Sequence, residues 1–178
     1  YLYSGIAKTY LRGKLGPTIY DLELFPVNTI KKSNQPYHFI VEKDASVKLT
    51  KTDLDYHQKM DTKAFLIFQG DTLVYEKYFD EHTQNQVSNS FSAAKSVIGM
   101  LIGIAIEEGK ITSVEDLAGK YIPEFNKNGR EKITIRHLLT MSAGFDWVES
   151  GKNPLSEAAE GYYGTDLYGL VTRLRVID

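Results

Sequence analysis

The sequence predicts an α+β fold in which a β-hairpin precedes a series of helices. Two aromatic and β-branched runs, residues 64–68 and 72–79, are separated by Gln69, Gly70 and Asp71. A Gly-Asp turn between such runs is typical of an antiparallel hairpin. A long apolar helical pattern follows at 92–108, and shorter helical patterns alternate with turn residues after it. Two strands followed by a string of helices favour α+β over a parallel βαβ sheet.

The chain before the hairpin gives weaker patterns. Residues 1–13 are loosely helical, and Gly13, Gly16 and Pro17 end that pattern. We expect extended connectors at 21–26 and 29–35, a short strand at 37–41, and an irregular or briefly helical stretch at 49–61. Between the hairpin and the apolar helix, residues 80–89 form a polar loop.

The pattern at 92–108 predicts the longest helix, about 25 Å at roughly 1.5 Å per residue, which Gly109 ends. Its middle, 97–106, is apolar on nearly every face, so we expect a central, buried helix. Residues 113–116 cap a short helix that ends before Pro123. Another helix is expected at 134–141, and two more begin near 153–154 and 165–166, the second running to about Arg173.

Composition excludes several classes of protein. The 178 residues are enough for one domain with a real core. Lys and Arg total 21 against 23 Asp and Glu, and the mixed charges give no nucleic-acid surface. Cysteine is absent, which excludes disulfides and thiolate chemistry. The longest uncharged apolar run, 97–106, is too short for a membrane span, and no signal-peptide pattern is visible.

The chemically most informative motif is Ser92-Ala93-Ala94-Lys95. A serine three residues before a lysine places both side chains on one helix face, about 5–6 Å apart at Cβ. An amine at that position can take a proton from the hydroxyl without a histidine. The helix N-terminus also favours developing negative charge. Ser92 and Lys95 are therefore the candidate catalytic residues.

The same four residues have a purely structural interpretation. In a surface helix, Ser92 would be a cap and Lys95 a solvated side chain. The context here is an apolar helix, and a lysine carried into a core pairs with an acid or loses its proton more easily. Residue chemistry alone leaves both interpretations open.

Other catalytic constellations fit the sequence less well. There is no Gly-x-Ser-x-Gly elbow and no Gly-rich phosphate loop, so no cofactor is expected. The four histidines lack His-Glu-x-x-His spacing, so no metal is expected either. His137 lies among apolar residues and is predicted to be structural and hydrogen-bonded. Tyr162 and Tyr163 lack a Tyr-x-Asn or Tyr-x-Ser pattern, which favours packing roles.

Five segments, taken in order, resemble a known family. They are 65–68, 74–79, Ser90-Phe91-Ser92-Ala93-Ala94-Lys95-Ser96, 108–111 and 137–147. This ordered set is similar to the serine hydrolases of the class C β-lactamase and penicillin-recognising superfamily, in particular to the branch of esterases and 6-aminohexanoate-dimer hydrolases. The resemblance runs from about residue 64 to 147 and less sharply to the end.

The resemblance implies a β-lactamase/transpeptidase-like fold and a role for each motif residue. Ser92 would be the acylated nucleophile, with its backbone N–H as one oxyanion donor, and Lys95 its proton acceptor or a partner in that relay. His137 and Trp147 would be fold landmarks. The substrate would be a small-molecule ester, amide or β-lactam, with esterase or amidase favoured over β-lactamase. A periplasmic or secreted location would follow from the same resemblance.

The chain also departs from the family pattern. The downstream Tyr-x-Asn or Tyr-x-Ser element and the Lys-Thr-Gly-like strand do not occur in the 178 residues. We therefore expect residues 1–178 to be the N-terminal portion of a single domain, with the N-terminal segment and sheet hairpin at about 1–90 and the helical region at about 91–178.

In this interpretation the fold is incomplete because C-terminal strands are absent, which leaves the hairpin with bare edges. The fragment would be inactive by itself, and its own C-terminal fragment would be a partner. The alternative function is a non-catalytic penicillin-binding or sensor domain on the same fold.

Overall fold

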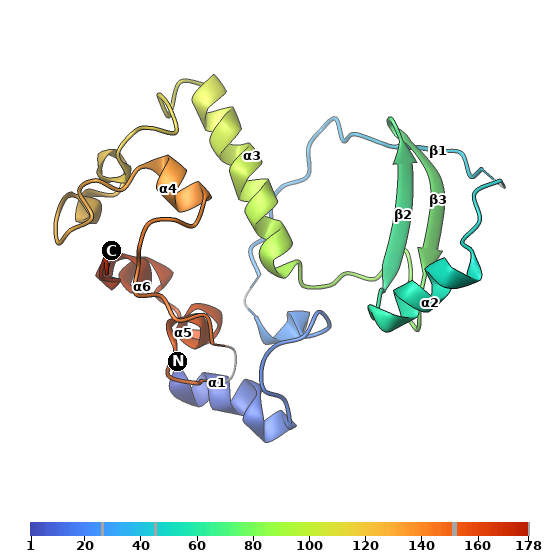
Figure 1. The fold of residues 1–178 in the computed structure, drawn as a ribbon, viewed down its shortest axis with the longest axis horizontal. Helices are drawn as coiled ribbons and strands as arrows, with labels where there is room; N and C mark the ends of the chain where they lie inside the picture. The colour runs from blue at the N-terminus through green and yellow to red at the C-terminus, as the bar shows by residue number, and fades with distance from the viewer. Residues whose placement is uncertain (26, 45, 151–152, 178) are drawn as a thin grey trace. The chain divides into compact units, whose positions relative to one another are not determined.

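The computed structural model describes residues 1–25, 27–44, 46–150 and 153–177, and its contacts divide the chain into two compact units. Unit 1 comprises Tyr1–Pro26 and Ser88–Asp178, and unit 2 comprises Val27–Val87. Figure 1 labels the elements. Unit 2 holds β1 (Ile40–Val41), α2 (Lys51–Lys59), β2 (Ala64–Gln69) and β3 (Thr72–Tyr78). Unit 1 holds α1 (Leu2–Lys8), α3 (Ala94–Glu107), α4 (Ile135–Leu139), α5 (Glu157–Tyr163), α6 (Leu167–Arg173) and five 3-10 turns, η1 (Tyr10–Arg12), η2 (Leu22–Leu24), η3 (Phe91–Ala93), η4 (Ala118–Lys120) and η5 (Pro123–Asn126).

The sheet of unit 2 contains the predicted hairpin. β2 and β3 pair antiparallel around a two-residue turn in which Gly70 has a φ of 58°, a conformation that glycine adopts without strain. β1 pairs parallel to β3, giving the order β1-β3-β2. The strand expected at 37–41 is present as the two residues of β1, and it covers part of the β3 edge of the hairpin, an edge expected to be bare.

Helix α2 covers part of this sheet. Its first turn is fixed by a capping box between Thr50 and Asp53. The His57 ring is buried and lies 4.5 Å, centroid to centroid, from the Phe65 ring. Residues 49–61 were expected to be irregular or briefly helical. The structure has the helix, and the capping box at its start favours it.

Short elements of unit 1 surround its hydrophobic core. The residues that form this core are Ala118, Phe125 and Ile133, with Ile122, Leu138, Ala143, Phe145 and Val176 packed against them. The segment after residue 113 forms only the 3-10 turns η4 and η5, so the short helix expected to end before Pro123 is reduced to η4. The backbone bonds from Ala118 N to Ile133 O and from Ile135 N to Asp116 O tie this segment to its neighbour instead.

Helix α3 forms where the apolar pattern predicts it and ends at Gly109, whose φ of 69° is left-handed. Its burial differs from the prediction, because no residue of α3 is buried. Val97, Ile98, Met100, Leu101 and Ile104 are each about half exposed or more. A helix that is apolar on every face is buried only where other elements pack around it, and the described residues of unit 1 do not bury α3.

None of the helices in the described part of the chain combines the length and apolarity that crossing a membrane requires.

Candidate active site

The predicted nucleophile and its lysine meet at the start of α3. Ser92 lies in η3, which leads directly into the helix. The Nζ of Lys95 donates a hydrogen bond to Ser92 Oγ at 2.9 Å. That distance falls within the range of about 2.6–3.2 Å needed for direct proton transfer. The structure thus brings together the two residues that the motif singles out.

The backbone immediately before Ser92 is in an unusual conformation. Phe91 has a φ of 43°, in the left-handed region that non-glycine residues rarely adopt. Such a residue costs about 1–3 kcal/mol and persists only where its surroundings fix it. The Ala93 N–H donates to Ser90 O at 3.0 Å and closes the turn around it. Strain of this kind concentrates at functional sites, and here it lies next to the candidate nucleophile.

The start of α3 favours an anion through the dipole of the helix. No side chain caps the helix, and its first turn contains no acidic residue. The N–H groups and dipole of a 14-residue helix favour negative charge at this end. Lys95 itself is exposed, so the structure as described does not carry this lysine into a core.

Ser92 and Lys95 line a cavity of about 670 Å³, a size suited to a small organic molecule. Two further polar residues, His137 and Glu149, also line it. The rest of the lining is mainly apolar and comes from the C-terminal end of α4 and the segment after it: Leu138, Met141, Ala143, Gly144, Phe145 and Trp147.

The apolar wall is attached to the core of unit 1. The Phe145 ring packs edge-on against the fully buried Phe125, with centroids 5.9 Å apart. Behind it, Asp146 N donates to Arg175 O at 2.9 Å, and Ile177 N donates to Gly144 O at 2.8 Å. The wall is therefore fixed by packing and by backbone pairing with the end of the chain.

His137 is hydrogen-bonded at the start of α4, as the sequence predicts. Thr134 forms a capping box with it: His137 N donates to Thr134 Oγ1, and Thr134 N donates to His137 Nδ1, each at 3.2 Å. This box starts α4 and places the imidazole in the cavity lining.

Tyr162 and Tyr163 pack against other aromatic rings, as predicted. Tyr163 stacks on Phe25, and the ring of Tyr162 lies 6.3 Å from the ring of Phe91. Burial raises the pKa of the Tyr162 phenol, and the nearby charge of Glu149 adds to the shift. A phenol whose pKa is raised stays protonated at neutral pH and is a poor base.

Two features of the site escaped the sequence argument. Glu149 accepts a hydrogen bond from the indole of Trp147 at 2.5 Å and gives the cavity its one carboxylate among the described lining residues. Asn89 bonds to residues 18 and 19, far away in the sequence. Glu149 lies two residues after a predicted landmark, whereas nothing in the local sequence of Asn89 indicates a partner 71 positions earlier.

The described residues contain no group of three or more His, Asp or Glu side chains arranged to hold a metal ion. The site is built from a hydroxyl, an amine and an apolar cavity. This arrangement can perform nucleophilic attack on a carbonyl carbon.

Comparisons with known proteins relate this chain to a family and to a fold. A model of the Beta-lactamase family matches residues 48–175. The 6-aminohexanoate-dimer hydrolase of Paenarthrobacter ureafaciens is 26% identical over 106 residues, which make up 58% of this chain and 27% of that protein.

A solved structure, described as a candidate 6-aminohexanoate-dimer hydrolase from Bacillus anthracis, aligns with a TM-score of 0.58 and 22% identity. The alignment covers 76% of this chain and 37% of that one, and at this identity it supports the fold alone. This chain therefore spans between a quarter and two fifths of the length of these relatives.

Proposed function

This chain belongs to the Beta-lactamase family, and on that premise we propose that it carries the nucleophile of a serine hydrolase. Ser92 attacks the carbonyl carbon of a small-molecule ester or amide and becomes acylated, and Lys95 accepts the proton of its hydroxyl. The observation that supports this proposal most strongly is the 2.9 Å contact between Ser92 Oγ and Lys95 Nζ beside the cavity.

The local chemistry supports each step. With Lys95 as a neutral amine, the same contact lets the Ser92 hydroxyl donate to Nζ, so attack and proton transfer occur together. The backbone N–H of Ser92 and the uncapped start of α3 stabilise the oxyanion as it forms. The Lys95 ammonium gives this proton to the leaving group, which departs as the neutral alcohol or amine, and water then hydrolyses the acyl-enzyme to the free acid and Ser92.

The substrate class follows from the cavity and the relatives. A mostly apolar lining suits an aliphatic or aromatic acyl group. The relative from Paenarthrobacter ureafaciens is named for hydrolysis of a 6-aminohexanoate dimer. We favour an ester or linear amide over a β-lactam on these grounds.

Complete turnover needs groups beyond those described around this cavity. Among the described residues that line it, none is a tyrosine that could assist proton transfer to the leaving group. We therefore propose that residues 1–178 alone acylate slowly and do not turn over. In this proposal the partner of residues 1–178 is their own C-terminal fragment, which would supply the rest of a single β-lactamase-like domain and complete the site.

Labelling with a fluorophosphonate probe tests the nucleophile. We expect intact-mass spectrometry to show one adduct per chain, which Ser92→Ala abolishes and Lys95→Met slows by about 10²–10⁴-fold. Ser96→Ala, one residue beyond the lysine, is the matched control and should label at the wild-type rate. Labelling that persists in Ser92→Ala would disprove the proposal.

Hydrolysis of a p-nitrophenyl ester separates the two functions that the fold can host. Turnover in the protein as it is encoded, lost in Ser92→Ala, supports the hydrolase. Stable acylation of Ser92 by a β-lactam, with no release and no ester turnover, would instead support a penicillin-binding sensor. Turnover by the isolated 178 residues would contradict the proposed inactivity of this part.

A further inference from the structure

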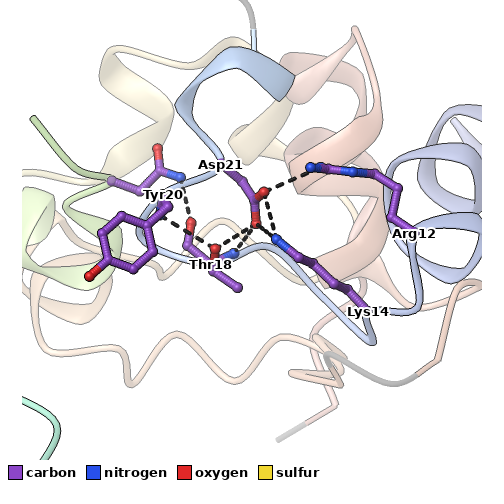
Figure 2. Close-up of polar contacts among 6 residues, drawn as sticks. Arg12, Lys14, Thr18, Tyr20 and Asp21 are labelled. Carbon is purple, nitrogen blue, oxygen red and sulfur yellow. Dashed lines mark hydrogen bonds and ion pairs between the residues drawn. The ribbon is translucent and has the colours of Figure 1, made fainter. Parts of the chain in front are cut away.

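A buried aspartate organises the turn at residues 18–21, which we call the Asp21 turn. Asp21 is only 4% exposed. Its carboxylate accepts hydrogen bonds from both the N–H and the Oγ1 of Thr18, each at 2.7 Å. The Lys14 Nζ lies at 2.9 Å and the Arg12 Nη1 at 3.2 Å from Asp21 Oδ1, so four donor groups surround one carboxylate (Figure 2). The turn is consequently held rigidly.

The Asp21 turn presents two carbonyl groups to Asn89. The Asn89 Nδ2 donates to Thr18 O at 2.9 Å, and the Asn89 backbone N–H donates to Ile19 O at 2.8 Å. One side chain and one main-chain group thus fix Asn89 against a segment about 70 residues earlier. Both partners belong to the same compact unit as Ser92.

Asn89 is two residues before the strained Phe91 and three before Ser92. A left-handed backbone at Phe91 persists only if the chain is held on both sides of it. On the downstream side, the chain enters the 14-residue helix α3. On the upstream side, the two bonds of Asn89 are the long-range hydrogen bonds nearest to Phe91 within residues 88–91.

We propose that Asn89 and the Asp21 turn are positioning residues for the Ser92 nucleophile. The inference rests on the proposed function of Ser92. By anchoring the backbone before Phe91, the turn holds Ser92 Oγ within hydrogen-bond distance of Lys95. Neither Asn89 nor Asp21 lines the cavity, so neither touches the substrate.

This positioning uses a part of the chain outside the family match. The Beta-lactamase model begins at residue 48, so it includes Asn89 and Ser92 but not the Asp21 turn. In this proposal the N-terminal segment contributes to positioning Ser92, because its Thr18 and Ile19 carbonyl groups accept the hydrogen bonds of Asn89, and Asn89 and Ser92 both lie in the matched region.

The test measures how fast a fluorophosphonate probe labels Ser92 in the protein as it is encoded. Asn89→Ala removes the side-chain bond and should lower the maximal labelling rate by about 10–100-fold, as expected for a misplaced nucleophile. The probe concentration at half-maximal rate should stay within about twofold, because the cavity lining is intact. Asn85→Ala, in the same loop, is the matched control and should label like the wild type.

A double-mutant cycle distinguishes positioning from general support of the fold. If Asp21 acts through Asn89, Asp21→Asn combined with Asn89→Ala should lower the rate by clearly less than the product of the two single effects, because only the main-chain bond of residue 89 to Ile19 is then left to lose. Thermal melting monitors folding in each variant. Where Asp21→Asn melts before the assay temperature, Thr18→Val replaces it in the cycle, because it removes one of the bonds to the carboxylate.

The outcomes separate this inference from the proposed function. A labelling rate in Asn89→Ala within twofold of the wild type, or additive losses in the cycle, overturns the positioning role while Ser92 remains the nucleophile. Equal labelling of Ser92→Ala and the wild type overturns the proposed function itself. A lowered rate with an unchanged half-maximal concentration and non-additive losses supports the positioning role.

Discussion

Replacing Phe125 with alanine tests whether the cavity wall depends on the core behind it. The Phe125 side chain is 0% exposed, it meets the Phe145 ring edge-on, and the Arg130 guanidinium lies 5.6 Å from its ring centroid. Truncating a buried phenylalanine costs about 3–5 kcal/mol, including the cavity left behind. Because domains are stable by about 5–15 kcal/mol, this single change removes a large fraction of the total.

Urea denaturation measures the effect. With a slope near 2 kcal/mol per molar urea, a loss of about 4 kcal/mol lowers the midpoint by about 2 M at an unchanged slope. Phe125→Leu keeps the site apolar and leaves a smaller void, so it should cost clearly less than Phe125→Ala. Because Phe145 lines the cavity, Phe125→Ala should also weaken probe binding at Ser92. A midpoint shift below about 0.5 M would refute the view that this core supports the wall.

Three further changes test other parts of the structure. Arg130→Met should lower the free energy of unfolding by about 2–4 kcal/mol in urea titrations, because it leaves buried carbonyl groups without their donor. Hydrogen bonds from Thr18 hold the pKa of Asp21 well below its usual range. The stability that the ionised carboxylate contributes is therefore present above about pH 4 and is lost as the pH falls further. The difference in free energy of unfolding between the wild type and Asp21→Asn should consequently become smaller from pH 6 to pH 3. Thr134→Val should cost about 0.5–2 kcal/mol by removing the hydroxyl that accepts the His137 N–H, and a control Thr134→Ser should restore most of it.

Local sequence patterns predicted the elements that short-range physics specifies. Gly70 permits the tight hairpin turn, and Gly109 ends α3 in a left-handed conformation. Ser156 and Asp166 cap the last two helices near the predicted starts. The Ser92 and Lys95 pair was also predictable, because its geometry depends only on a spacing of three along one helix.

The features that escaped prediction depend on residues distant in the sequence. The anchor between Asn89 and Thr18 spans 71 positions and has no periodicity. The burial of α3 was predicted from its own composition, whereas burial depends on which neighbours cover it. The short helix expected after Ser113 is reduced to 3-10 turns, because the backbone there also bonds to the segment around Ile133.

The capping box of α4 has a consequence for the path of the proton. Because Thr134 N–H donates to His137 Nδ1, the neutral imidazole carries its hydrogen on Nε2. In that tautomer one ring nitrogen is occupied as an acceptor and the other is already a donor, so the ring has no lone pair free to receive a proton from Ser92. For His137 to act as the base for Ser92 at this cavity, the hydrogen bond from Thr134 N–H to His137 Nδ1 at the start of α4 would first have to break. The nitrogen base in hydrogen-bond contact with the Ser92 hydroxyl is therefore the amine of Lys95.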